Sequence, residues 1–75
     1  MNKSYIAVTV KENNLFYAYI LPIVDGVNVK HKLDSIKGLQ WAEIYHTKKN
    51  AAAIAEMWNQ YYKKHDKYLF DKPLS

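Results

Sequence analysis

The sequence predicts an α+β fold in which an antiparallel sheet of three to four strands carries one amphipathic helix on one face. Two observations lead to this prediction. Several short segments alternate apolar and polar residues with the period of two that strands require, and one long segment near the carboxyl end repeats its apolar residues with helical spacing. The expected order is four strands followed by the helix, with a short final strand as one alternative for the last residues.

The amino-terminal part predicts a hairpin. Residues Tyr5 to Lys11 alternate in character, and Leu15 to Ile23 return as a second strand that is apolar on both faces. Between them, Asn13 and Asn14 mark a turn, because asparagine tolerates the left-handed backbone that tight hairpins need.

The register of this hairpin has two alternatives. A loop of three residues pairs Val10 with Phe16 and leaves Tyr17 and Tyr19 on the outer face, whereas a turn of two asparagines reverses those roles. In either register, large side chains remain on the outer face. That surface needs cover from the carboxyl-terminal residues, from a second copy in a homodimer or from another protein.

Two further strands are predicted before the helix. Residues Val27 to Leu33 alternate in character after a turn signal at Asp25 and Gly26, and Leu39 to His46 leads directly into the helix. After the helix, Tyr68 to Phe70 either adds a brief strand or packs as an apolar tail.

The helix is predicted between Thr47 and His65. Thr47 is the expected N-cap, because its hydroxyl can accept a hydrogen bond from the backbone two or three residues later. Trp58 is expected at the centre of the core. At about 100° per residue, one face gathers Thr47, Ala51, Ile54, Ala55, Trp58, Tyr61, Tyr62 and His65.

The length of 75 residues predicts one small domain over residues 1–70, with a frayed tail over 71–75. Because the chain has no cysteine, stability must come from the packing of its seven tyrosines and two tryptophans or from self-association. No apolar run approaches the roughly 18 residues that span a membrane, and the start shows no cleavage site, so a cytoplasmic protein is expected.

The charge is concentrated in the second part of the chain. All eleven basic residues are lysines, and residues 30–75 carry the whole net charge of +4. The absence of arginine disfavours reading of a specific base sequence, because bidentate recognition is a property of arginine. Abundant lysine, asparagine, isoleucine and tyrosine indicate AT-rich codons and hence a low-GC bacterium or its phage.

A candidate anion site lies at the helix start, where Thr47 precedes Lys48 and Lys49. The helix dipole disfavours cations there by about 0.3 to 1 kcal/mol each, and a bound phosphate would relieve this misfit. Lys63 and Lys64 extend the basic surface at the other end of the helix. The competing interpretation is that these lysines are simply solvated.

A candidate site for a protein partner includes Tyr17 and Tyr19, with Lys30 and Lys32 on the next predicted strand. Tyrosines on an exposed strand can anchor a partner, and an unpaired strand edge can accept another strand. The alternative is that the carboxyl-terminal aromatic residues cover these tyrosines.

The sequence predicts a non-enzymatic protein without a metal or cofactor. His31, His46 and His65 lack the spacing of metal ligands, and no catalytic triad, glycine-rich loop or carboxylate pair is recognisable. A chain of this length can barely enclose a substrate pocket.

The helix start also carries a resemblance to nucleic-acid-binding proteins. The run from Thr47 to Ala51, followed by further alanines, resembles the start of the second helix in double-stranded-RNA-binding domains. It is also similar to the helix start in the arm-binding domains of tyrosine integrases. The resemblance implies contacts between Lys48 or Lys49 and phosphates.

Over the whole chain, the segments Tyr5 to Val10, Tyr17 to Tyr19, Thr47 to Lys49, Trp58 to Asn59 and Tyr68 to Phe70 resemble small uncharacterised proteins carried by mobile elements of gut Firmicutes. This resemblance implies an accessory protein that binds host machinery, of which anti-CRISPR inhibitors are the familiar example. The expected function is therefore binding to a larger host protein. The alternative is a nucleic-acid-binding module that contacts phosphates through the lysines of the helix start.

Overall fold

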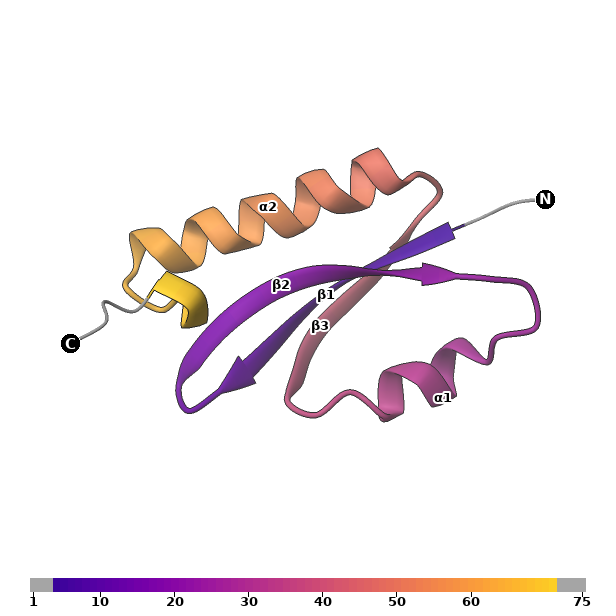
Figure 1. The fold of residues 1–75 in the computed structure, drawn as a ribbon, viewed down its shortest axis with the longest axis horizontal. Helices are drawn as coiled ribbons and strands as arrows, with labels where there is room; N and C mark the ends of the chain where they lie inside the picture. Colours follow the sequence, from indigo (N-terminus) through magenta and orange to yellow (C-terminus); the bar gives the residue numbers. More distant parts are fainter. Residues whose placement is uncertain (1–3, 72–75) are drawn as a thin grey trace.

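The computed structural model describes residues 4–71, which form an α+β domain with a three-stranded antiparallel sheet of order β2-β1-β3. Two α-helices, α1 and α2, lie on opposite sides of this sheet (Figure 1). Of the tail predicted at 71–75, residues 72–75 lie outside the described range. In chain order, the elements are β1 (Ser4–Glu12), β2 (Leu15–Ile23), α1 (Val29–Asp34), β3 (Leu39–Tyr45), α2 (Lys48–Lys64) and the short 3-10 helix η1 (Leu69–Asp71).

The hairpin between β1 and β2 closes through a turn of two residues. Asn13 and Asn14 have φ angles of 53° and 67°, which matches a type I′ turn. Glu12 is therefore directly opposite Leu15. The structure thus selects the second of the two registers that the sequence allowed.

The central strand β1 is buried on both faces. The Thr9 side chain hydrogen-bonds to Tyr62 of α2, so Ala7 and Thr9 face α2, whereas Ile6, Val8 and Val10 face the opposite side. All five residues are at most 3% exposed. The register with two asparagines predicts Tyr17 and Tyr19 on the inner face, which is wrong, because Phe16 faces α2 and the two tyrosines lie on the opposite face. The long helix covers the face with the smaller side chains, because its own alanines can approach such a surface closely.

The strand predicted over Val27–Leu33 is also wrong, because this segment begins helix α1. Asn28 caps the helix, and its side-chain oxygen accepts a hydrogen bond from the backbone N–H of His31 at 2.9 Å. Its half-buried residues Val29 and Leu33 are four positions apart, a spacing that suits one face of a helix as well as one face of a strand. The described sheet therefore has three strands, and α1 is a second helix that the pattern did not predict.

Helix α2 has the predicted ends. The hydroxyl of Thr47 accepts a hydrogen bond from the backbone N–H of Asn50 at 3.1 Å, and His65 is the C-cap. Trp58, expected at the centre of the core, is only half-buried. The buried residues of α2 are Ala51, Ala55 and Tyr62.

The residues after α2 return along β2. The backbone N–H of Phe16 donates to the carbonyl of Lys67 at 2.7 Å, and Phe16 forms an isolated parallel bridge with Tyr68. Phe70 then packs edge-on against Tyr17, with ring centroids 4.8 Å apart. The segment thus combines both predicted alternatives, a single strand-like bridge and an apolar tail.

Candidate functional site

The outer edge of β2 is closed by polar contacts at Phe16 and Ala18. The backbone N–H of Ala18 donates to Asn59 Oδ1 at 2.7 Å, and Asn59 Nδ2 donates to the carbonyl of Ala18 at 3.0 Å. Two residues earlier, the backbone N–H of Phe16 donates to the carbonyl of Lys67. Further along the same edge, Pro22 has no N–H to offer. The side-chain amide of Asn59 therefore takes the place of a neighbouring strand.

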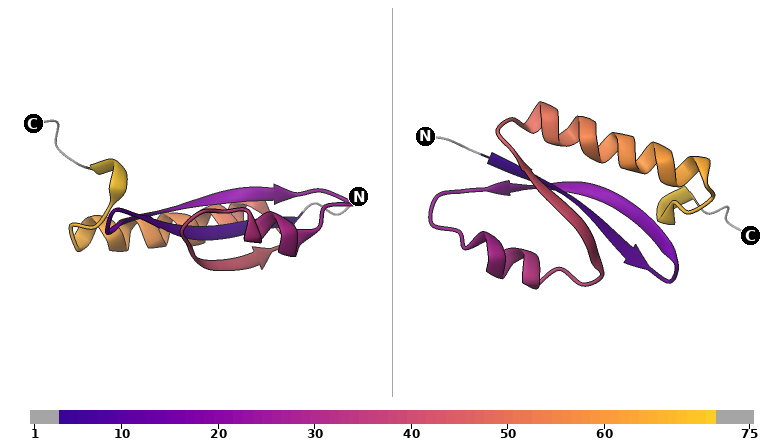
Figure 2. Two further views of the ribbon diagram at one scale, coloured as in Figure 1. Left: turned by 90° about the horizontal axis from the view of Figure 1, so that it is seen from below. Right: turned by 180° about the vertical axis from the view of Figure 1, so that it is seen from behind.

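The outer edge of β3 is open as far as residues 4–71 are concerned. The N–H and C=O groups of Ala18 point away from β1. Thr9 is directly opposite Ala18, and in such a pair both residues point their backbone groups away from each other, so the N–H and C=O groups of Thr9 point toward β3. Thr9 lies opposite Trp41, so Trp41 bonds to β1, and Ala42 and Ile44 direct their N–H and C=O groups outward. Within residues 4–71, no strand pairs with this side of β3 (Figure 2).

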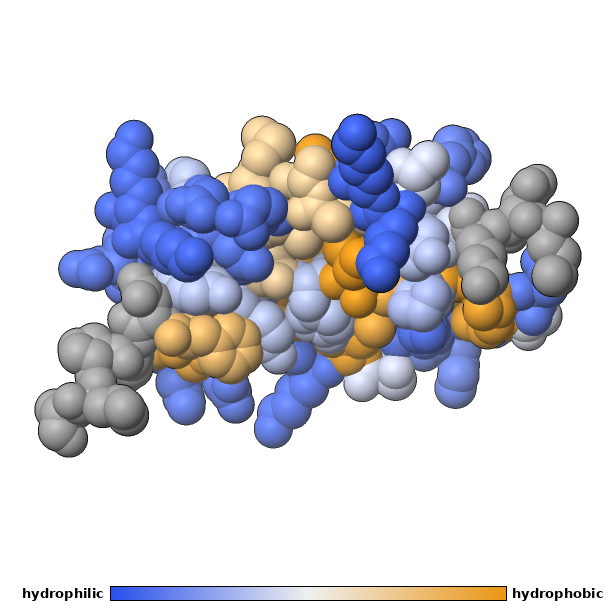
Figure 3. All heavy atoms as spheres, turned by 45° about the horizontal axis from the view of Figure 1, so that its top comes forward, coloured by the Kyte–Doolittle hydropathy of each residue, from blue (hydrophilic) through white to orange (hydrophobic). Residues whose placement is uncertain are grey.

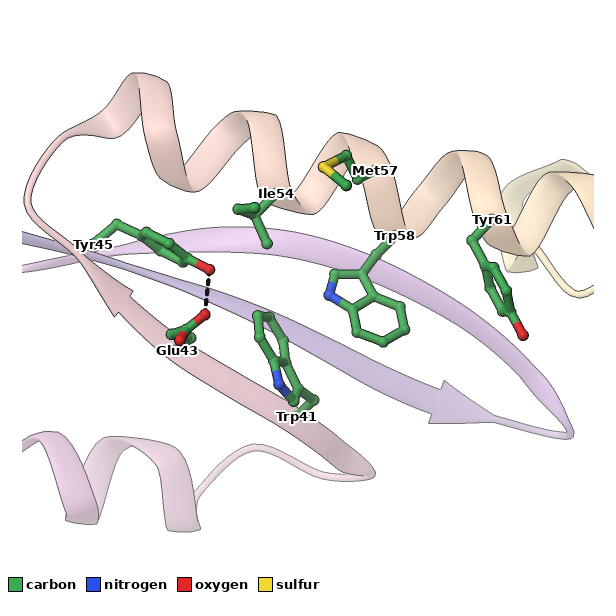
Figure 4. Close-up of a pocket in the computed structure, with 7 residues that line it drawn as sticks. All are labelled: Trp41, Glu43, Tyr45, Ile54, Met57, Trp58 and Tyr61. Carbon is green, nitrogen blue, oxygen red and sulfur yellow. Dashed lines mark hydrogen bonds between the residues drawn. The ribbon is translucent and has the colours of Figure 1, made fainter.

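An apolar groove of about 600 Å³ lies between β3 and α2. Figure 4 shows its lining side chains, which come from β3 and α2 and point toward one another. Two of its lining residues, Met57 and Tyr61, are 66% and 52% exposed. Large apolar side chains that are exposed side by side are typical of interaction surfaces. The groove is lined by Trp41, Glu43, Tyr45, Ile54, Met57, Trp58 and Tyr61.

A row of aromatic rings fixes the groove to the core. The Trp41 and Trp58 rings are 5.4 Å apart, Trp58 stacks on Tyr62 at 5.8 Å, and Tyr62 stacks on Phe16 at 5.2 Å. Tyr62 is 5% exposed. Its burial raises its pKa, an effect that a hydrogen bond with the Thr9 side chain partly opposes. The row therefore runs from the groove to β2 and holds the inner wall in place.

Glu43 is the only charged residue in the groove lining. Its carboxylate accepts a hydrogen bond from the hydroxyl of Tyr45, two residues further along the same face of β3. This hydrogen bond, followed by burial and the negative charge of Glu43, raises the pKa of Tyr45 to about 12. The groove thus offers a partner an aromatic surface with a single carboxylate.

The lysines of the predicted anion site do not form one patch. Lys48 and Lys49 begin α2, whereas Lys63 and Lys64 end it, about 24 Å away along the helix axis. Figure 3 shows hydrophilic residues toward both ends of the molecule and a more apolar surface between them. The hydroxyl of Thr47, at the helix start, caps the helix itself.

The lysines assigned to a protein partner lie on α1 instead of a strand. Lys30 forms an exposed ion pair with Asp34 at 4.0 Å. Lys32 is half-buried, and its Nζ donates to the carbonyl of Pro22 at 3.4 Å. Neither lysine lines the groove.

Tyr17 and Tyr19 lie on the face of the sheet opposite α2. Phe16, on the same strand, stacks on Tyr62 of α2, and successive side chains of a strand point to opposite faces. Their rings stack at 5.6 Å, and both are half-buried. Burial, with Tyr17 close by, raises the pKa of Tyr19. The tyrosines named from the sequence and the groove are therefore on different faces.

The sequence did not predict the groove, because its tryptophans and tyrosines have the spacing of core residues. The only signal was an excess of large aromatic residues on α2 over what a small sheet can cover.

The fold and the groove define a small α+β domain with an aromatic surface beside the outer edge of β3, with which no strand within residues 4–71 pairs. No protein-family model, no curated protein and no solved structure matches this chain. None of the helices within residues 4–71 is long and apolar enough to cross a membrane. In the same part of the chain, no three or more histidine, aspartate or glutamate side chains gather where a metal ion could be held.

Proposed function

We propose that this protein is a non-enzymatic binding module that holds an apolar segment of another protein in the groove between β3 and α2. The observation that carries the proposal is the exposure of Met57 and Tyr61 beside the half-buried Trp41 and Trp58. Full burial of one such large side chain contributes about 1.5 to 3 kcal/mol. A partner that covers the groove would gain this free energy from several side chains at once.

The composition of the groove also suits a protein contact. Tryptophan and tyrosine are enriched among the residues that contribute most to protein interfaces. The rings of Trp41 and Trp58 are already held against each other, so little side-chain entropy is lost when a partner binds. The inhibitor of a host defence protein implied by the resemblance to mobile-element proteins is one specific form of this proposal, with its target in the bacterial cytoplasm.

Phosphate binding at the helix start is the alternative function from the sequence. It depends on Lys48 and Lys49, which are exposed at the start of α2. We rank it second, because the remaining lysines of the predicted site lie at the far end of the helix. One experiment distinguishes the two functions.

The experiment is an affinity pull-down from a lysate of a low-GC bacterium, with and without nuclease, using three forms of the tagged protein. Met57→Glu introduces a charge in the groove at an exposed position. Ala52→Glu introduces the same charge on the same helix, at an exposed position away from the groove. We expect a protein that wild type and Ala52→Glu retain after nuclease treatment and that Met57→Glu loses.

Circular dichroism of all three forms checks that the variants are folded. Equal capture by all three would show that the groove is not the binding site. Loss of the captured material on nuclease treatment, and in a Lys48→Ala/Lys49→Ala variant, would instead support the nucleic-acid function.

A further inference from the structure

We infer that the groove accepts an extended segment of the partner, which pairs with the open edge of β3 and has the pattern apolar, any residue, lysine or arginine, any residue, apolar. This inference rests on the proposed function and specifies its ligand. It combines three observations: the open edge, the direction of the β3 side chains and the single charge in the groove.

The open edge provides the backbone contacts. Ala42 and Ile44 direct their N–H and C=O groups away from β1, and the groove opens beside them. An unpaired edge of this kind is a template for another strand, and strand addition is a common mode of peptide recognition. The corresponding groups of Ala18 on β2 are already bonded to Asn59, so β2 does not offer the same template at this position.

The side chains of β3 determine the pattern of the segment. Trp41, Glu43 and Tyr45 all face the groove. Residues directly opposite each other on paired strands share a face, about 4.5 to 5.5 Å apart. The residue opposite Glu43 therefore enters the groove, as do its neighbours two positions away, opposite Trp41 and Tyr45. This pattern is the same for a parallel and an antiparallel segment.

The carboxylate of Glu43 selects the central residue. Covering it with apolar groups alone would remove it from water without a cation, which is costly. A lysine or arginine opposite it supplies that cation, while its aliphatic part packs against the rings.

The same charge argues against a second copy as the occupant. Glu43 is the only charged residue of β3. Pairing of β3 with β3 of another copy would bring no lysine to Glu43, and in one register would place two glutamates opposite each other, which is unfavourable. The charge thus favours a different protein over a homodimer.

The inference is tested with a phage-displayed library of random nine-residue peptides, selected on the immobilised wild-type protein. We expect enrichment of the stated pattern. The same selection on Glu43→Gln should lose the preference for lysine or arginine at the central position and keep the flanking apolar residues.

An enriched peptide, made synthetically, tests strand pairing directly. Ala42→Pro removes an N–H that points outward and should weaken binding about tenfold, the value of roughly one backbone hydrogen bond. Ala52→Glu should bind as wild type does. Methylation of the peptide amides on alternate residues gives two series, and only the series that faces β3 should lose binding. This arm uses the wild-type protein and holds even if Ala42→Pro does not fold.

Four outcomes would overturn the inference: enriched peptides with helical spacing, equal loss of binding in both methylated series, concentration-dependent dimers that occupy the β3 edge, or no enrichment at all. In each case the pull-down with Met57→Glu decides separately whether the groove still binds a protein. A failure of strand addition is therefore distinguishable from a failure of the proposed function.

Discussion

The two outer strands of the sheet differ in how their edges are finished. On β2, the backbone groups of Ala18 bond to both ends of the Asn59 amide, which offers one donor and one acceptor as a strand would. On β3, the equivalent groups of Ala42 and Ile44 point outward. At Ala18, one side chain of α2 therefore makes the two contacts that a neighbouring strand would make.

The closed edge and the open groove have one cause, the position of α2 over the sheet. The helix packs mainly on β2 and β1 and touches β3 least. Asn59 bonds to β2 on one side, so the opposite side of α2, with Met57 and Tyr61, extends past the covered part of the sheet. The same placement that protects β2 therefore leaves the aromatic groove beside β3.

The largest expected loss of stability is that of a proline at Ala18 on β2, compared with the same substitution at Ala42 on β3. Ala18→Pro removes an N–H that is bonded to Asn59 and adds a ring at a buried position, so the free energy of unfolding should fall by about 2 to 5 kcal/mol. Ala42→Pro removes an N–H that points outward and should cost about 1 kcal/mol or less. Urea unfolding followed by circular dichroism measures both. Equal losses would show that the two edges do not differ as described.

A smaller effect is expected when the closing side chain itself is removed. Asn59→Ala leaves two partly buried backbone groups of Ala18 without their partner, which should lower the free energy of unfolding by about 1 to 3 kcal/mol. The control is Gln60→Ala, which removes only an exposed hydrogen bond to Glu56 and should change stability by about 0.5 kcal/mol or less. Chemical denaturation of the three proteins is the measurement. A loss for Asn59→Ala no larger than for the control would contradict the role of Asn59.

Most of the fold follows from local pattern. The bounds of β2 and the caps of α2 at Thr47 and His65 are as the sequence predicted. The segment Val27–Leu33 was assigned wrongly because its two spaced apolar residues fit either period, and the capping hydrogen bond of Asn28 decides for the helix.

The groove could not be predicted in the same way. The pattern assigned Trp58 and Tyr61 correctly to the apolar face of α2, but burial depends on how far the sheet extends beneath them. That depends on the contact between Asn59 and Ala18, which are 41 residues apart in the chain and carry no shared pattern. Exposure of the groove thus depends on tertiary packing between distant parts of the chain, which no local pattern carries.

The smallest expected effect concerns the single charge beside the open edge. The hydrogen bond from Tyr45 to Glu43 raises the pKa of Tyr45 to about 12, above its usual value of 10.0. Because the raised pKa favours the neutral phenol in the folded protein, the contribution of this pair to stability is complete below pH 10 and is lost as the pH rises through about 12. Glu43→Gln removes the negative charge, so the pKa of Tyr45 should fall toward 10.

The measurement is a pH titration of the Tyr45 ring carbons by nuclear magnetic resonance, which separates this residue from the other tyrosines. Tyr62, whose raised pKa comes mainly from burial, should titrate as in wild type. Glu56→Gln, an exposed change on α2, is the matched control and should leave Tyr45 unchanged. An unchanged pKa of Tyr45 in Glu43→Gln would mean that the carboxylate does not hold this hydroxyl. Glu43 would then be free to take a cation from a partner without first releasing Tyr45.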